Sequence, residues 1–240
     1  MAENGDNPAV YLFPVPMGDG AVADVLPARN VELLKTIRYF VVENIRSARR
    51  FLRAASRDIV IDDLHFTELS EHTPPSEVAE MLAPMAQGHS IGVISEAGCP
   101  AVADPGADLV AVAQRRGLKV VPLVGPSSIL LSLMGSGFNG QSFAFLGYLP
   151  IEAKARANAF RELERRVRRD SQTQIFIETP YRNNRLIGEL CQALPADMLL
   201  CVASDITGPR ESIVTLPISK WRSRQYDYSK IPTIFLIYKQ

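Results

Sequence analysis

The chain has 240 residues, 47% of them hydrophobic, which is long enough for one large or two small domains with a proper core. Lysine and arginine together number 26, as do aspartate and glutamate, so no global positive field indicates RNA binding by charge alone. The three cysteines, Cys99, Cys191 and Cys201, are too few and too scattered for a disulfide framework or a zinc site. Because no apolar run reaches membrane-spanning length and residues 1–7 lack a signal-peptide layout, we expect a cytoplasmic protein with no membrane or metal partner.

The first half of the chain alternates short apolar runs with amphipathic ones. The apolar runs predict strands at residues 10–13, 39–43, 58–61, 91–95 and 120–124. The amphipathic runs predict helices at residues 31–37, 47–55, 76–87, 107–116 and 127–135. Repeated alternation of strand and helix predicts an α/β fold with a mostly parallel sheet and helices on both of its faces.

The second part of the chain has a different pattern. Aromatic residues gather at 141–150, and a long charged helix is predicted at 153–169. Further strands are predicted at residues 174–178, 199–204, 212–216 and 233–238. Fewer helices and more adjacent strands indicate a second, α+β domain with a mixed sheet, so we expect domains at 1–139 and 140–240.

One loop carries the most information about function. Residues 95–106 read S-E-A-G-C-P-A-V-A-D-P-G and lie between a predicted strand and a predicted helix. Loops at the carboxyl ends of parallel strands are where open α/β sheets bind small ligands. The spacing is also compatible with an ordinary turn, in which Asp104 caps the next helix and Pro105 takes its first position.

A second loop, Gly125-Pro126-Ser127-Ser128, follows the next predicted strand, and its serines can cap a helix or offer hydroxyls to a ligand. Together the two loops resemble the tetrapyrrole-methylase superfamily, the class III S-adenosylmethionine (SAM)-dependent methyltransferases. Within it they are similar to the ribosomal RNA small-subunit methyltransferase I branch. The resemblance implies two α/β domains with SAM in the cleft between them, a homodimer, and methylation of a ribose 2′-hydroxyl of ribosomal RNA.

The resemblance also implies which residues contact the cofactor. These are Pro16 and Gly18, then Ser95, Ala97, Gly98, Pro100 and Asp104, then Gly125, Pro126, Ser127 and Ser128, and finally Ala203, Pro232 and Thr233. A glycine at position 98 would let the backbone approach the cofactor without a Cβ in between. The loops depart from the family pattern at Asn44, Glu96, Cys99, Tyr181, Ser204 and Asp205, and the chain stops soon after its last predicted strand, where that branch commonly has a small extension.

Methyl transfer to a hydroxyl requires removal of a proton, and the candidate catalytic carboxylates are Glu43, Glu96 and Glu178. Each of them could instead pair with Arg46 or Arg182.

The candidate substrate-binding residues are Arg46, Arg49, Arg50, His72 and Arg182. The first three continue to Arg53 at helical spacing, which indicates either a phosphate-binding stripe or a solvated helix face. A lone histidine is more often structural than catalytic, and nothing clusters with it to bind a metal.

No G-x-G-x-x-G and no phosphate-binding P-loop motif is present in the sequence, which disfavours a dinucleotide enzyme and an NTPase. The first hypothesis is therefore in-line methyl transfer from SAM, which leaves S-adenosylhomocysteine, to a ribose of ribosomal RNA. The alternatives are a methyltransferase for a small molecule of tetrapyrrole type and a catalytically silent, SAM-binding dimeric module. A wide apolar cleft without a basic surround would favour the small molecule, and cofactor binding without turnover would favour the silent module.

Overall fold

The structure, a computed structural model, describes residues 7–239 and divides into two units between Pro126 and Ser127. The first unit contains a five-stranded sheet whose strands are all parallel, in the order β3-β2-β4-β1-β5. Its strands are β1 (Ala9–Phe13), β2 (Tyr39–Val42), β3 (His65–Glu68), β4 (Ile91–Ile94) and β5 (Lys119–Pro122). Its helices are α1 (Val22–Val25), α2 (Ala28–Leu34), α3 (Ile45–Ala55), α4 (Pro75–Glu80), α5 (Ala83–Ala86) and α6 (Gly106–Arg115), with a 3-10 turn η1 (Ile61–Asp63).

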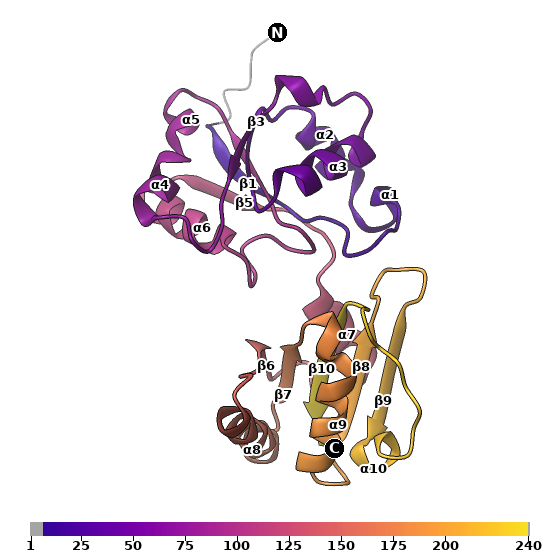
Figure 1. Ribbon diagram of the computed structural model, residues 1–240. Helices are drawn as coiled ribbons and strands as arrows, with labels where there is room; N and C mark the ends of the chain where they lie inside the picture. Colours follow the sequence, from indigo (N-terminus) through magenta and orange to yellow (C-terminus); the bar gives the residue numbers. More distant parts are fainter. Residues whose placement is uncertain (1–6, 240) are drawn as a thin grey trace. The chain divides into compact units, whose positions relative to one another are not determined.

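Helices cover both faces of this sheet, as the sequence predicts (Figure 1). Successive strand residues point to opposite faces, so one apolar run supplies two cores. Phe13 packs among the residues of α2 and α3, whereas its neighbour Leu12 packs among those of α4, α5 and α6. Gly92 in β4 lies beneath the ring of Phe40, where an added Cβ would be 2.6 Å from a ring carbon, so only glycine fits.

Three predicted elements of the first unit differ from the structure. The strand predicted at 58–61 is wrong: Ile59 and Ile61 are buried in the core as part of a turn, and the edge strand is β3 instead. The helix predicted at 76–87 is two short helices, because Pro84 lacks the N–H that a continuous helix would need. The helix predicted at 31–37 begins and ends three residues earlier, as α2.

The second unit contains a mixed sheet in the order β6-β7-β10-β8-β9, in which β6 and β7 are parallel and the remaining neighbours antiparallel. Its strands are β6 (Phe143–Tyr148), β7 (Thr173–Ile177), β8 (Leu199–Ser204), β9 (Ser212–Pro217) and β10 (Thr233–Tyr238). Its helices are α7 (Ser128–Ser136), α8 (Ala153–Asp170), α9 (Asn183–Ala193) and α10 (Ile218–Trp221), with a 3-10 turn η2 (Pro180–Arg182). The expected α+β domain with a mixed sheet is therefore confirmed.

Helices α8, α9 and α10 bury one face of this sheet around Phe176, Phe235 and Trp221. Helix α7 packs against β8, β9 and β10, and the Thr215 hydroxyl donates to the Ser136 carbonyl over 2.9 Å. Because α7 belongs to this unit, the division of the chain lies before it rather than at residue 140, where the sequence places it. Among the described residues, no helix is long and apolar enough to cross a membrane.

Candidate functional site

The loops of interest in the first unit gather at one edge of the parallel sheet. Strands β1 and β4 are neighbours, and the chain continues from β1 to β2 and from β4 to β5. These two connections pass over opposite faces of the sheet, and at such a switch point open α/β sheets bind ligands. The carboxyl ends of these strands and the loops that follow them are called the crevice below.

Hydrogen bonds hold the loop after β1 against the central loop 95–106. Val15 and Gly98 exchange two backbone hydrogen bonds, of 2.9 and 3.2 Å. Gly98 has a φ of +71°, which a side chain would strain, and Met17 lies 3.8 Å from where its Cβ would be. The expected contact positions Pro16, Gly18 and Gly98 thus belong to one assembly.

The loop after β5 joins the same assembly. An added Cβ on Gly125 would be 2.2 Å from the Pro14 ring, so this position admits only glycine. The Cys99 thiol donates to the Pro126 carbonyl over 3.3 Å, and the Asn30 amide donates to the Val124 carbonyl over 2.8 Å. Burial and the nearby Asp104 carboxylate raise the pKa of this thiol, which therefore stays protonated at neutral pH.

Asp104 fixes the shape of the central loop. Its carboxylate accepts from the Ala101 N–H over 2.9 and 3.0 Å and from the Gly106 N–H over 2.7 Å. Between these bonds Ala101 and Ala103 have φ values of 64° and 58°, a left-handed conformation that side chains rarely adopt. Helix α6 begins at Gly106, one residue later than a cap at Asp104 with Pro105 at the first position would require. The carboxylate nevertheless satisfies a first-turn N–H, as a capping residue does.

Two of the three candidate catalytic carboxylates meet at this edge. The Glu96 N–H donates to Glu43 Oε2 over 3.1 Å, and the Ser47 hydroxyl donates to Glu96 Oε1 over 3.2 Å. Burial raises the pKa of Glu43, and the charges of Asp104 and Glu96 raise it further, against the lowering effect of that hydrogen bond. Burial likewise raises the pKa of Asp104. No ion pair joins Glu43 to Arg46 within residues 7–239.

The third candidate, Glu178, has a structural environment. Its side chain is 2% exposed and pairs with Arg156 over 3.0 Å and with Arg182 over 2.7 Å. It also accepts from the Thr179 N–H over 2.8 Å. Its oxygens are thus occupied by partners within the second unit, and Arg182 is occupied with them. This arrangement does not favour Glu178 as a base or Arg182 as a substrate contact.

The remaining second-unit candidates lie at neighbouring strand ends. Ala203 and Thr233 belong to the paired strands β8 and β10, and Thr233 lies opposite Ser204. The Pro232 carbonyl accepts from the Asp205 N–H over 2.9 Å, and Asp205 has a φ of 49°. The structure therefore brings the three expected contacts Ala203, Pro232 and Thr233 together at one end of this sheet.

Ser127 is the N-cap of α7, where its hydroxyl accepts from the Leu130 N–H over 3.5 Å, and the helix starts at Ser128. His72 lies on an exposed turn, and its imidazole contacts only the Glu71 carboxylate, 3.6 Å away, among the described residues. Arg46, Arg49 and Arg50 are exposed on α3.

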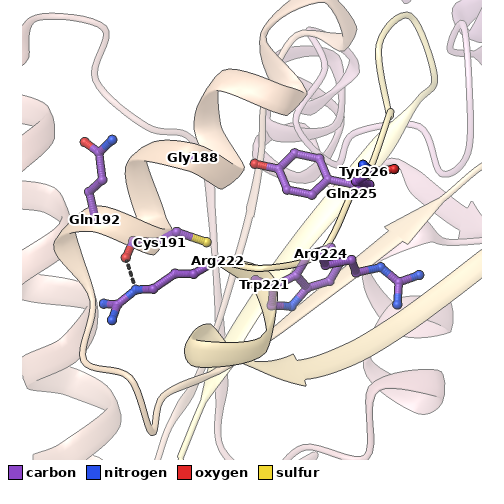
Figure 2. Close-up of a pocket in the computed structure, with 8 residues that line it drawn as sticks. All are labelled: Gly188, Cys191, Gln192, Trp221, Arg222, Arg224, Gln225 and Tyr226. Carbon is purple, nitrogen blue, oxygen red and sulfur yellow. Dashed lines mark hydrogen bonds between the residues drawn. The ribbon is translucent and has the colours of Figure 1, made fainter.

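A pocket of about 660 Å³ opens in the second unit (Figure 2). Its lining residues are Gly188, Cys191, Gln192, Trp221, Arg222, Arg224, Gln225 and Tyr226. The Arg222 guanidinium donates to the carbonyls of Cys191, over 2.8 Å, and Leu194, over 3.2 Å, which satisfies the end of α9. The Arg224 guanidinium lies 5.5 Å from the centre of the Trp221 ring. None of these residues was expected at a site, and the contacts of Arg222 and Arg224 are structural.

Two contributors to the first-unit site carry no motif signal of their own. Ser47 and Val15 contact the central loop through bonds that only the paired strands bring into range. In the part of the chain that the structure describes, no group of three or more His, Cys, Asp or Glu side chains could hold a metal ion.

Comparison with known proteins identifies the family. The ribosomal RNA small subunit methyltransferase I of Mesorhizobium japonicum is 31% identical over 209 residues, which cover 87% of this chain and 67% of that protein. The Vibrio cholerae protein of the same name is 27% identical over 234 residues, or 96% and 77% of the two chains. The chain belongs to the ribosomal RNA small subunit methyltransferase I family. No family model matches it.

Solved structures confirm the fold of this ribosomal RNA small subunit methyltransferase I family member. The methyltransferase CobJ matches with a TM-score of 0.64 and 16% identity, over 98% of this chain and 95% of CobJ. Uroporphyrin III C-methyl transferase from Thermus thermophilus matches with a TM-score of 0.58 and 18% identity, over 96% and 97%. The expected family, the tetrapyrrole-methylase fold, the methyltransferase class and the SAM cofactor are all confirmed.

Proposed function

We propose that this chain methylates a ribose 2′-hydroxyl of small-subunit ribosomal RNA, using the crevice at the carboxyl edge of the parallel sheet. The observation that carries the proposal is the convergence of three loops there, each following a strand and each carrying motif residues of the family. The relatives named for ribosomal RNA supply the substrate class. Two strand connections that pass over opposite faces of the sheet supply the place for a ligand.

The chemistry of the crevice suits SAM. A recess of about 10 Å³, with room for about one water molecule, marks the ends of β2 and β4 and places Ser95, Glu43 and Asp104 side by side. Carboxylates and a hydroxyl can accept hydrogen bonds from amino and ribose hydroxyl groups, and negative charge favours a cationic sulfonium. Gly98 leaves its Cβ position empty beside Met17. When bound, SAM supplies an electrophilic methyl group.

The residues of the chain would then position the acceptor hydroxyl and remove its proton. Glu96 is the better candidate base, because its side chain is exposed at the crevice and only Ser47 contacts its carboxylate among the described residues. Glu43 is half-buried and holds the Glu96 backbone, so its role would be to position that loop. In the second unit, Ser127, Ser128, Ala203, Pro232 and Thr233 stay candidate cofactor contacts. A homodimer and a cytoplasmic location complete the proposal, in line with a ribosomal substrate.

The first experiment is calorimetric titration of the full chain with SAM and with S-adenosylhomocysteine. We expect micromolar binding that is weakened in Gly98→Val and unchanged in Gly117→Val, which is a matched control because Gly117 also has a positive φ but lies at the far end of α6. Absence of binding for both ligands at millimolar concentration would refute the proposal.

The second experiment incubates the protein with isotopically labelled SAM and small ribosomal subunits. We expect label in ribosomal RNA at a nucleotide whose phosphodiester bond resists alkaline hydrolysis, because a 2′-O-methyl group protects that bond. We expect this labelling to be lost in Glu96→Gln. Labelling of a uroporphyrin-type tetrapyrrole in place of RNA would favour the small-molecule alternative. SAM binding with no labelled acceptor of either kind would favour the silent module.

A further inference from the structure

The exposed arginines of α3 differ from the other arginine-rich helix of this chain. Helix α8 carries four arginines in its last two turns, and each pairs with a carboxylate within 2.5–2.8 Å. These are Arg165, Arg166, Arg168 and Arg169, which pair with Glu162, Glu164 or Asp170. On α3, none of Arg46, Arg49, Arg50 and Arg53 forms an ion pair with any carboxylate among residues 7–239. Helix α3 therefore presents four exposed arginines on one face without a carboxylate partner among these residues.

The sequence of α3 accounts for this face. Ala48, Phe51 and Leu52 are buried, and the arginines occupy the opposite side of the helix at positions three and four apart. The Arg49 guanidinium lies 5.4 Å from the centre of the Phe66 ring on β3, which supports it without neutralising its charge. From Arg46 to Arg53 the face extends roughly 10 Å along the helix axis, which matches about three nucleotides of a nucleic-acid strand.

The arginine face begins at the crevice proposed for methyl transfer. Asn44 caps α3, and the Ser47 hydroxyl in its first turn donates to Glu96 Oε1 over 3.2 Å. Arg50 Nη2 is 3.5 Å from that same hydroxyl oxygen. A strand whose phosphates follow α3 would therefore have one nucleotide next to the central loop. At the far end of the helix, the recess lined by Arg53 and Arg57 also contains Asp62, so the basic face stops there.

We propose that Arg46, Arg49, Arg50 and Arg53 form a phosphate-binding surface that aligns single-stranded RNA with the central loop. The proposal rests on the proposed function for its substrate class, whereas the contacts rest on the unpaired charges of α3. Each neutralised phosphate of a single strand releases counterions and adds about 0.7 to the slope of log affinity against log salt concentration. The arginines would hold RNA without reading its sequence, and base recognition would belong to the crevice.

The test measures binding of a labelled single-stranded fragment of small-subunit ribosomal RNA across a potassium chloride series. The variant R49Q/R50Q/R53Q is compared with R165Q/R166Q/R168Q, which removes the same charge from α8. We expect the salt slope of the α3 variant to fall by roughly 2, from three lost phosphate contacts. The α8 variant should keep the wild-type slope, and SAM binding by calorimetry should be the same in all three proteins.

Equal slopes for the α3 variant and the wild type would overturn the inference, as would equal losses in both variants, which would indicate net charge alone. Binding to phosphatidylserine vesicles but not to the RNA would also overturn it in favour of a membrane surface. Because SAM binding is measured on the same samples, failure of the RNA surface and failure of the proposed methyltransferase give different results.

Discussion

Asp104→Ala tests whether one carboxylate holds the central loop in its strained conformation. The substitution removes the acceptor for the N–H groups of Ala101 and Gly106. A hydrogen bond to a charged group contributes about 1.5–3 kcal/mol, and water can replace part of it at this half-buried site, so we expect a loss of about 2–4 kcal/mol. The left-handed backbone at Ala103 would then relax, since each such residue costs about 1 kcal/mol or more to maintain.

Asp104→Asn separates shape from charge. The amide keeps one acceptor oxygen, and it removes a charge that burial disfavours, as the raised pKa of Asp104 shows. We therefore expect about half the loss of the alanine variant or less. Asp108→Ala is the matched control, because that carboxylate lies in the first turn of the same helix and is exposed. Its removal should cost no more than about 1 kcal/mol through the helix dipole.

Hydrogen exchange of peptides spanning residues 95–106, together with calorimetric SAM affinity, is the assay. Fluorescence of the single tryptophan, Trp221, reports on the second unit and should not change. We expect faster exchange in this loop. We also expect SAM to bind about tenfold more weakly, because about 1.4 kcal/mol of the binding free energy would be spent on ordering the loop again. Wild-type exchange across the loop in Asp104→Ala would refute the reasoning.

Three further predictions concern single positions. Glu43→Gln should raise the free energy of unfolding at neutral pH, because burial disfavours the charged carboxylate of the wild type. In urea titrations at a series of pH values, this gain should shrink as pH falls through the raised pKa of the folded state and vanish below the ordinary pKa of glutamate in the unfolded chain; a gain that is constant with pH would contradict this. Glu178→Gln should destabilise the second unit by about 1–3 kcal/mol in urea titrations followed by tryptophan fluorescence, because the buried Arg156 loses one of its two carboxylate partners and keeps only Glu189. An effect on turnover with unchanged stability would contradict that structural role. Gly125→Ala should lower the free energy of unfolding by about 1–3 kcal/mol, because the added Cβ would overlap the rigid ring of Pro14. A thermal melt with the wild-type melting temperature would contradict the packing described.

The predictability of the elements followed from how they are buried. Strands β1 and β4 were predictable, since all but one of their residues are buried and their apolar runs are continuous. Strand β3 was not, because it is an edge strand whose residues are exposed except for the half-buried Phe66. Its pairing with β2 provides the stability that its own sequence does not indicate.

For the site, loops could be predicted and contacts could not. Gly98, Asp104 and Ser127 follow strands and carry turn chemistry, so their place was readable from the sequence. The contact of Glu43 with Glu96 joins residues 53 positions apart and depends on the pairing of β2 with β4. The partner Arg156 of Glu178 lies on α8, and only the packing of α8 against the sheet determines which charge it meets.

The position of β10 in its sheet determines when the second unit can be completed during synthesis. This strand lies between β7 and β8 and is hydrogen-bonded to both, although it is the last strand of the described chain. Until Thr233–Tyr238 emerge from the ribosome, β7 and β8 face each other across an empty place, with unpaired edges and exposed apolar side chains. Nascent chains that stop before residue 233 thus expose surfaces that favour aggregation, and the second core closes only after residues 233–238 have emerged.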